Sequence, residues 1–272
     1  MYKEWKSLTS QRSSTSLKMY TTVRFAELYL KSDPVRRWML ALLRDNIQRA
    51  TNESVSSIEG RIIIREYNKN IASILKHTFG VVSFSPCHVV EKNIAAIEKT
   101  SVQLMKGVSK KKTFAIDVTR SDKAFPFTSN QAEQKIGERI FNMGYRVNLT
   151  KPDKTIHIEI RDNAYIYSEI ISGPGGMPLG SAGIVTCKLT TERDLLACCL
   201  MMKRGCLVIP RRANKKLLAR LKKWYVGREI KKKGNSMADV TSETRLSKLE
   251  PSVFAPLVGF SNAEINKMIK KI

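Results

Sequence analysis

The strongest constraint on the fold is an alternation of strand-like and helix-like segments in the C-terminal part of the sequence. Residues 183–189 and 206–210 are short apolar runs that contain β-branched side chains, as is typical of buried strands. Residues 191–205 and 214–230 follow them with the apolar spacing of helices. This order is the pattern of a parallel sheet, so we expect a reduced α/β fold over residues 173–272.

Two smaller units precede this region, and we expect both to be α+β. In the first, residues 21–106, a strand leads into a long helix with Asp33 as its N-cap and Pro34 in its first turn. A shorter helix in this unit is predicted to end at Gly80. The inward face of the long helix is predicted to consist of Val35, Trp38, Met39, Leu42, Leu43 and Ile47.

The second unit, residues 107–172, combines a strand, an amphipathic helix and a β-hairpin. The helix is expected to be capped near Ser129 and to end at Gly144, and Asp162 with Asn163 forms the hairpin turn. The glycine- and proline-rich residues 173–180 read as a linker. Residues 1–20 are polar and basic, and we expect a flexible tail there.

The charge of the chain restricts the classes of partner that it is expected to bind. Its 272 residues include 48 Lys and Arg against 24 Asp and Glu, a formal net charge of +24. A folded chain this basic is expected to bind a polyanion, either nucleic acid or an anionic membrane surface. The alternative is that the excess charge only keeps the protein in solution. No apolar run reaches the ~20 residues that span a bilayer, and the first 20 residues lack a secretory signal, so we expect a cytoplasmic protein without a membrane partner.

The five cysteines do not form a recognisable framework. Cys87 stands alone, and the other four lie within twenty residues without a C-x-x-C pair: Cys187, Cys198, Cys199 and Cys206. An odd number of cysteines argues against a disulfide scaffold, and the three histidines (His77, His88 and His157) lie far in the sequence from the cluster of four cysteines. We therefore expect buried free thiols and no metal site.

The sequence resembles a known family, the tRNA 4-thiouridine sulfurtransferases, or ThiI-like proteins. The resemblance is collinear over most of residues 21–272. It rests on the segments VRFAELYLKS, GRIIIRE, FGVVSFSP, RSDKAFPFTSNQ, KPDKTIHIEIRDNAYIYSEIISGPGGMPLGSAG, LMMKRGCLVIP, VTSET and PLVGFSNAEI. It implies a ferredoxin-like domain over residues 21–106, a THUMP domain over 107–172 and a Rossmann-like PP-loop domain over 173–272.

The resemblance also implies a function. In the family, the first two domains grip the acceptor region of tRNA, and the PP-loop domain uses ATP to adenylate a uridine before sulfur is delivered to it. The PP-loop reads S-G-G-x-D-S, and its glycines let backbone N–H groups approach a pyrophosphate. Counting back from residues 200–205 places Leu189, Thr190, Thr191, Glu192, Arg193 and Asp194 in those six positions.

None of those six residues matches the loop. Two threonines replace the glycines, and β-branched residues resist positive φ and close backbone approach. Thr191 with Asp194 instead reads as a helix cap close to a capping box. We therefore expect a degenerate, shortened PP-loop domain without a bound cofactor.

The reactive thiol is a second expected loss. The family's catalytic cysteine follows the segment that residues 256–272 match, and the sequence ends at Ile272. No G-x-S-x-G, G-x-x-x-x-G-K-[ST] or H-E-x-x-H motif offers another catalytic site. His157, in an alternating strand, is interpreted as a packed or surface histidine rather than a base. No catalytic residue is predicted.

Two groups of basic residues are the candidate RNA contacts. In the THUMP unit they are Arg120, Lys123, Lys151 and Lys154, beside Phe125 and Phe127, which either stack on bases or pack the loop. Lys110, Lys111 and Lys112 are weaker candidates. In the predicted helix at 214–230, Leu217, Leu221 and Trp224 form the inward stripe, and the candidates around it are Lys215, Lys216, Lys222 and Lys223. The alternative for these lysines is a solvated face.

The leading hypothesis is a non-enzymatic tRNA-binding protein that presents tRNA to a separate PP-loop or sulfur-carrier protein. The first alternative is a divergent ATP-dependent tRNA 4-thiouridine sulfurtransferase with an altered site or a partner chain. The second is a ribosome-associated factor that binds rRNA. The resemblance also leaves a homodimer open. A measurement of ATP binding distinguishes the leading hypothesis from the sulfurtransferase alternative. Competition between tRNA and rRNA fragments distinguishes it from the ribosome-associated alternative.

Overall fold

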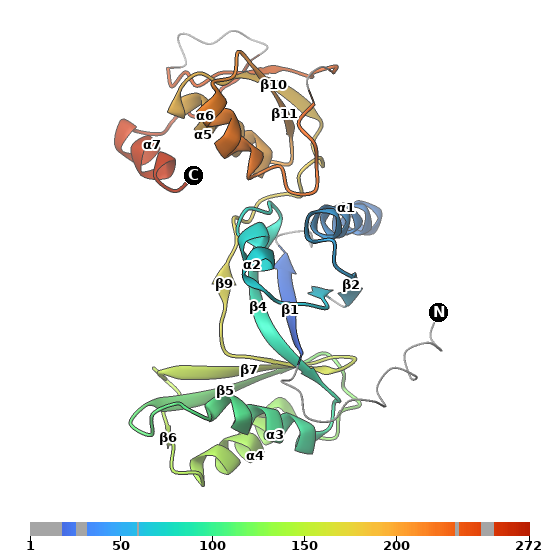
Figure 1. Cartoon of the computed structure of the whole chain (residues 1–272). Helices are drawn as coiled ribbons and strands as arrows, with labels where there is room; N and C mark the ends of the chain where they lie inside the picture. The colour runs from blue at the N-terminus through green and yellow to red at the C-terminus, as the bar shows by residue number, and fades with distance from the viewer. Residues whose placement is uncertain (1–17, 26–31, 59, 232–233, 246–252) are drawn as a thin grey trace. The chain divides into compact units, whose positions relative to one another are not determined.

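The structure is a computed structural model that describes residues 18–25, 32–58, 60–231, 234–245 and 253–272 (Figure 1). The chain divides into two compact units. The smaller unit contains residues 87–168 with the chain up to Tyr20, and the larger contains Thr21–Pro86 with Glu169–Ile272. Residues 1–17 of the predicted tail, and residues 26–31 between the first predicted strand and the long helix, lie outside the described residues. Met19 and Tyr20, which the tail was predicted to include, begin strand β1 (Met19–Phe25).

The first half of the larger unit is an antiparallel sheet with two helices. Strand β3 (Arg61–Ile64) pairs with β1 on one side and with β2 (Val55–Ile58) on the other. The first half of β4 (Val81–Val90) continues this sheet and pairs with β9 (Ile171–Ser172). The helices are α1 (Asp33–Thr51) and α2 (Lys69–Leu75). Side chains from the sheet and both helices form the core: Val23, Leu43, Ile47, Ile62, Ile64, Ile71, Leu75, Val81 and Phe84.

Helix α1 buries a narrower face than the sequence predicts. Met39, Leu43 and Ile47 are buried, but Trp38 is 51% exposed and Val35 is 37% exposed. The buried stripe runs instead through the polar Asn46, one residue before Ile47. Because a polar residue occupies part of the inward face, the spacing of apolar residues alone predicted the edge of that face at the wrong position.

Two predicted helix boundaries are also wrong. The N-cap of α1 is Ser32, and Asp33 is the first helical residue, where its carboxylate bonds to Arg36 at 2.6 Å. Helix α2 ends at Leu75, well before Gly80. Gly80 has φ +97° at the start of β4, where an added Cβ would meet Leu43 and the backbone of Pro178 at 3.2–3.3 Å. This glycine therefore serves a close approach and does not end the helix.

The second half of the larger unit is the predicted parallel sheet. Its strands are β10 (Ile184–Lys188), β11 (Leu207–Arg211), β12 (Asp239–Val240) and β13 (Val253–Phe254), and all neighbours in the order β11-β10-β12-β13 are parallel. The helices are α5 (Glu192–Lys203), α6 (Lys215–Lys222) and α7 (Asn262–Ile269). Helix α6 is shorter than predicted, because the chain turns after Lys223 and buries Trp224, Tyr225 and Val226.

The two halves of the larger unit touch through these turning residues. The ring of Trp224 stacks on Phe79 with centroids 5.0 Å apart. Gly227 has φ +66°, and a Cβ on it would lie 2.1 Å from the carbonyl oxygen of Asn46. Only glycine fits here, since the backbone of α1 occupies the space that a side chain needs.

The smaller unit is a mixed sheet with helices α3 (Ile94–Met105) and α4 (Ser129–Phe141). The second half of β4 pairs with β8 (Ala164–Tyr167), followed by β7 (Lys154–Ile160), β5 (Thr113–Arg120) and β6 (Arg146–Val147). The hairpin between β7 and β8 turns at Asp162–Asn163, as predicted. The N-cap of α4 is Thr128, one residue before the predicted Ser129, and it forms a capping box with Gln131.

Together these elements confirm the expected fold class. An α+β arrangement accounts for the chain through the β7–β8 hairpin, and an α/β Rossmann-like sheet follows it. Among the described residues, no helix is long and apolar enough to cross a bilayer.

Candidate nucleic-acid interface

Four lysines at the two ends of α6 are exposed, as the sequence predicts. Asn214 caps the helix by accepting hydrogen bonds from the N–H groups of Lys216 and Leu217. Leu217 and Leu221 are buried on the inner side. The remaining surface presents Lys215, Lys216, Lys222 and Lys223, and none of them pairs with a carboxylate among the described residues. Arg220, on the same helix, is already neutralised by Glu192 at 2.6 and 2.7 Å.

The predicted RNA contacts of the smaller unit lie at opposite ends of its sheet. Strands β5 and β7 are parallel, with Phe114 opposite Lys154 and Arg120 opposite Ile160. Six residues of extended strand, about 20 Å, therefore separate the two ends of this pair. Arg120 and Lys123 belong to one end, and Lys151 and Lys154 belong to the other.

Of the two candidates at the first end, Arg120 is engaged within the protein and Lys123 is available to a ligand. Arg120 donates from Nη1 to the carbonyl oxygens of Phe125 and Phe127 at 3.3 and 3.2 Å, which fixes the loop before α4. Phe125 is buried against Phe127, with centroids 5.9 Å apart. The packing interpretation therefore holds for Phe125. Lys123 is exposed.

At the second end, Lys151 is exposed and Lys154 is engaged. The Nζ of Lys154 donates to the carbonyl oxygen of Leu104 at 2.6 Å, so this lysine caps the end of α3. Burial, and then the nearby charge of Lys112, lower the pKa of Lys154. Lys110 likewise donates to a backbone carbonyl, that of Met143, and lies over the ring of Tyr145.

The loop at residues 189–194 comprises the connection from β10 to α5 (residues 189–191) and the first three residues of α5, which is where a nucleotide-binding loop lies in folds of this kind. Here the carboxylate of Asp194 fills the loop from within. Its Oδ2 accepts hydrogen bonds from the N–H groups of Thr190 and Thr191 and from the Thr190 hydroxyl, each at 2.9 Å. Its Oδ1 accepts from the Ser242 hydroxyl at 2.7 Å. The capping box that the sequence predicts, Thr191 with Asp194, is confirmed.

These bonds outweigh the cost of burying the charge. Burial alone would raise the pKa of Asp194, but the hydrogen bonds from Ser242, Thr190 and Thr191 hold that pKa below its usual value. The other loop residues do not face the same point. Leu189 is buried, Glu192 pairs with Arg220, and Arg193 donates to Asn262 on α7 at 2.9 Å.

A cleft of about 360 Å³ opens at the carboxyl ends of β10, β11 and β12. Its lining includes three cations, Lys188, Arg211 and Arg212, and one acid, Asp239. Arg212 is held at φ +48°, which is rare for a residue with a side chain. Sequence reasoning missed these residues, although all three basic residues lie at the ends of the predicted strands, where α/β sheets bind ligands.

All five cysteines are buried and free, as expected. Burial raises the pKa of the Cys199 thiol to about 12 and raises that of Cys206. The described residues contain no cluster of His, Cys, Asp and Glu suited to a metal ion. His157 lies on the sheet of the smaller unit, 2.8 Å from Asp117 and stacked on Tyr167.

Comparisons with known proteins agree with this architecture. Residues 20–85 match the family model of the ThiI ferredoxin-like domain, and residues 91–169 match that of the THUMP domain. A probable tRNA sulfurtransferase of Methanocaldococcus jannaschii is 37% identical over 209 residues, which cover 71% of this chain and 55% of that protein. One of Methanobrevibacter smithii is also 37% identical, over 68% of this chain and 51% of that protein. The chain thus spans about half the length of the curated relatives it matches.

Two solved structures share the fold over 93% of this chain. The crystal structure of a Pyrococcus horikoshii Ot3 protein matches with a TM-score of 0.80 and 27% identity, and 99% of that protein is covered. A 4-thiouridine synthetase–RNA complex with bound ATP matches with a TM-score of 0.78 and 21% identity over 84% of that chain.

The fold and these matches define a chain in which a ferredoxin-like domain and a THUMP domain accompany a Rossmann-like sheet. It is a ThiI-like protein, and the predicted resemblance to the tRNA 4-thiouridine sulfurtransferase family is confirmed.

Proposed function

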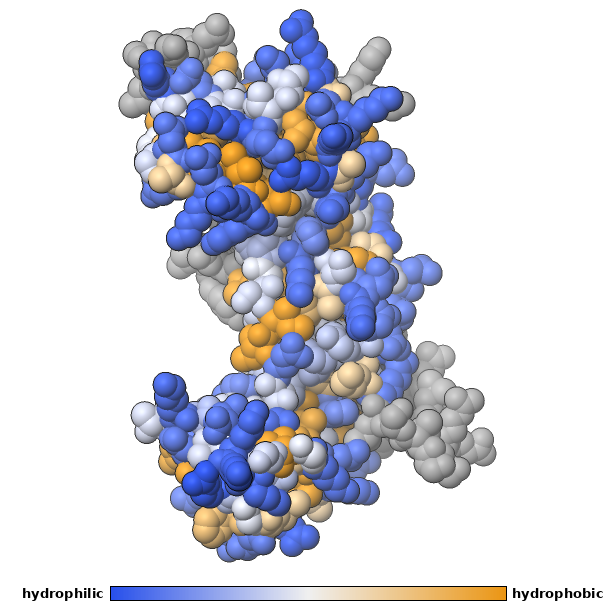
Figure 2. Space-filling model, turned by 60° about the vertical axis from the view of Figure 1, so that its left-hand side comes forward, coloured by the Kyte–Doolittle hydropathy of each residue, from blue (hydrophilic) through white to orange (hydrophobic). Residues whose placement is uncertain are grey.

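We propose that this protein binds tRNA at its acceptor region through the ferredoxin-like and THUMP domains. The observation that carries the proposal is the THUMP domain at residues 91–169 in a chain with a net charge of +24. Hydrophilic side chains predominate on the face of both units that Figure 2 shows. The exposed lysines Lys123 and Lys151, and the four on α6, supply unpaired charge for phosphate contacts.

The second part of the proposal is that the loop at 189–194 does not bind ATP. Thr190 and Thr191 stand where the family has glycines, and the carboxylate of Asp194 occupies their N–H groups. A pyrophosphate would have to displace this carboxylate and would also meet its negative charge. The residues present do not fit the nucleotide of the family, so we derive no adenylation step here. On this proposal the chain is a pseudoenzyme that presents tRNA to a separate PP-loop or sulfur-carrier protein in the cytoplasm.

The alternative is a divergent ATP-dependent tRNA 4-thiouridine sulfurtransferase, active with an altered site or a partner chain. The cleft beside Lys188, Arg211 and Arg212 favours it, because three cations at the carboxyl edge of a parallel sheet suit an anionic ligand. The names of the curated relatives favour it too. A homodimer, and the domain boundaries at residues 106 and 172, stay predictions.

Calorimetry tests both parts on one preparation of the full chain. We expect deacylated tRNA to bind and Mg-ATP to give no heat. A triple variant that restores the family residues at three of the altered positions, Thr190→Gly, Thr191→Gly and Asp194→Ser, is the matched comparison. Micromolar ATP binding by the unaltered chain would place the enzyme alternative first. Preference for rRNA fragments over tRNA in competition would contradict the first part.

A further inference from the structure

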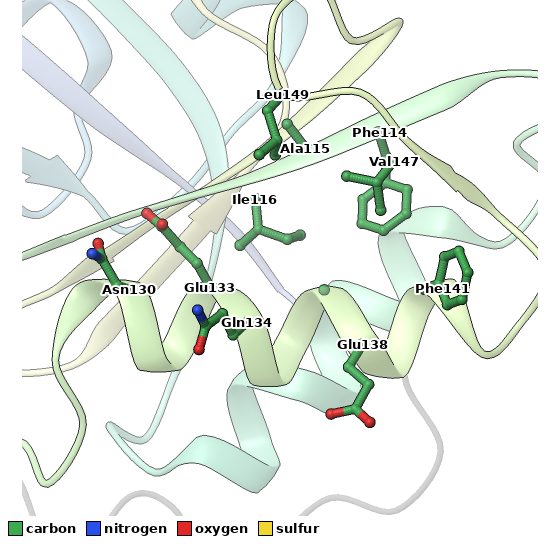
Figure 3. A pocket seen from close by; sticks show the side chains of 11 residues that line it. Phe114, Ala115, Ile116, Asn130, Glu133, Gln134, Glu138, Phe141, Val147 and Leu149 are labelled. Atoms are coloured by element: carbon green, nitrogen blue, oxygen red, sulfur yellow. The ribbon is translucent and has the colours of Figure 1, made fainter.

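A groove of about 550 Å³ lies on the smaller unit between α4 and the edge of the sheet. Figure 3 shows its two walls. Glu133 and Phe141 of α4 point up from the helix, whereas Glu138 lies on its outer side; Phe114 and Ile116 of β5 lie opposite, with Val147 and Leu149 from the chain after α4. Neither the candidate RNA contacts nor the loop at 189–194 uses this groove.

Three large apolar side chains along the groove are exposed. Phe141 is 57% exposed, Val147 is 46% exposed and Leu149 is 79% exposed. A single exposed apolar residue is ordinary, but three that converge on one hollow mark an interaction surface. In Figure 3, Phe141 lies at the end of α4 on the same side of the groove as Phe114 and Val147.

The groove also holds an open backbone edge. Strand β6 pairs with β5 only at Thr113 and Phe114, so β5 continues without a neighbour on that side. Two of its edge groups are satisfied locally: Asn148 N–H donates to the Phe114 carbonyl at 3.0 Å, and Val118 N–H donates to Glu133 Oε1 at 2.9 Å. Residues two apart on a strand direct their backbone groups to the same side. Ile116, between them, therefore presents its N–H and C=O to the groove.

The charge of the groove excludes RNA as its natural occupant. None of its eleven lining residues is basic, although the chain has 48 Lys and Arg. Two carboxylates, Glu133 and Glu138, lie along the α4 wall. A phosphodiester backbone would meet only like charge and apolar surface here, whereas a cationic peptide with apolar side chains would meet both an opposite charge and an apolar surface.

We propose that this groove binds an extended segment of a partner protein, with alternating apolar side chains and at least one Lys or Arg. The segment adds as a strand beside Ile116, so that backbone hydrogen bonds hold it. Its apolar side chains contact Phe141, Val147 and Leu149, and its cation lies near Glu138. The surface leaves the tRNA contacts free, so one chain can hold tRNA and a protein partner together.

The proposal is tested with a random 12-residue peptide library displayed on phage. The library is selected against the full chain in the presence of saturating tRNA. The same selection runs against a Leu149→Asp variant, whose side chain is exposed enough to leave the fold intact. We expect the unaltered chain to enrich peptides with alternating apolar residues and Lys or Arg, and the variant to bind them about tenfold or more weaker. Ile170→Asp, which removes a 51% exposed apolar side chain outside the groove, is the matched control and keeps full affinity.

Amide hydrogen exchange with the best selected peptide then locates the contact. Protection of the Ile116 amide on peptide binding is expected, with unchanged tRNA affinity in the Leu149→Asp variant. The proposal is overturned if no peptide is enriched whose binding is weakened by the Leu149→Asp change, or if acidic peptides are enriched. Protection of Ile116 by tRNA, or by a second copy at higher protein concentration without peptide, assigns the groove to another occupant and overturns it as well. If the unaltered chain does not bind tRNA, the proposed function is contradicted, but the result on peptide binding in the groove is unaffected.

Discussion

The Nε of Arg228 donates a hydrogen bond to Oδ1 of Asn46 over 2.6 Å. Asn46 is almost completely buried, and its Nδ2 donates in turn to the carbonyl oxygen of Leu179 at 3.0 Å. Arg228 also reaches Asp45 at 3.1 Å. One amide of α1 thereby bonds to two segments that lie more than 130 positions further along the chain. Gly227 makes this approach possible, because a Cβ at that position would collide with the backbone of Asn46.

Replacing Asn46 with Ala tests this junction. The change leaves the Leu179 carbonyl and part of the Arg228 guanidinium without their partner, and a buried polar group left unsatisfied costs about 1–3 kcal/mol. Amide hydrogen exchange of the buried residues of α1 should report a drop of that size in the free energy of opening. Gln48→Ala, at an exposed position of the same helix, is the control. Equal exchange in both variants would show that the junction contributes nothing.

A second prediction concerns Asp194 and pH. Its pKa is lowered in the folded chain, so it contributes stability at every pH above its unfolded value near 3.8, and this contribution is lost as the pH falls through the folded pKa. Asp194→Asn removes the titrating group. We expect the variant to be less stable near neutral pH by about 1–3 kcal/mol. We also expect it to lose less of its remaining stability between pH 5 and about pH 3 than the unaltered chain.

Urea titrations followed by circular dichroism at both pH values measure this difference. Glu264→Gln is the matched control, because Glu264 occupies the same position in the capping box of α7 but is exposed. A loss as large in that variant would mean that helix capping alone, and not the filled loop, accounts for the effect.

The sequence predicted most where spacing and local chemistry decide the structure. The alternation over residues 183–230 identifies the parallel sheet, because helices cover both faces of such a sheet and its strands therefore appear in the sequence as apolar runs. The cap formed by Thr191 and Asp194 follows from side-chain reach alone. The hairpin at Asp162–Asn163 is set by turn chemistry in the same way.

What the sequence missed depends on contacts between distant residues. Trp38 fits the apolar face of α1 by spacing, but the burial of Asn46 against Arg228 and Leu179 shifts that face and leaves the indole exposed. Lys154 looks like a free cation until the end of α3 supplies the Leu104 carbonyl. The groove beside Ile116 could not be predicted, because it requires the register of β5 with both β6 and β7.

A third prediction separates two neighbouring basic residues, Arg120 and Lys123. Lys123→Ala should weaken tRNA binding without changing stability, because its side chain is exposed. Arg120→Ala should free the loop before α4, because it removes the bonds to the Phe125 and Phe127 carbonyls. Hydrogen exchange of residues 124–128 distinguishes the two. Increased exchange in the Lys123 variant, or unchanged exchange in the Arg120 variant, would contradict these assignments.

The final prediction concerns the exposed lysines of α6. Each phosphate contact contributes about 0.7 to 0.9 to the slope of log affinity against log salt, since it releases condensed counterions. Changing Lys215, Lys216, Lys222 and Lys223 together to Gln should therefore weaken tRNA binding and flatten that slope by up to about three. A second variant with Lys69, Lys267, Lys270 and Lys271 changed to Gln loses the same charge from other exposed positions and serves as the control. Fluorescence anisotropy of labelled tRNA across a salt series measures both. If the two variants lose affinity and slope equally, the lysines of α6 act only through net charge, and the contact between this helix and the RNA backbone is ruled out.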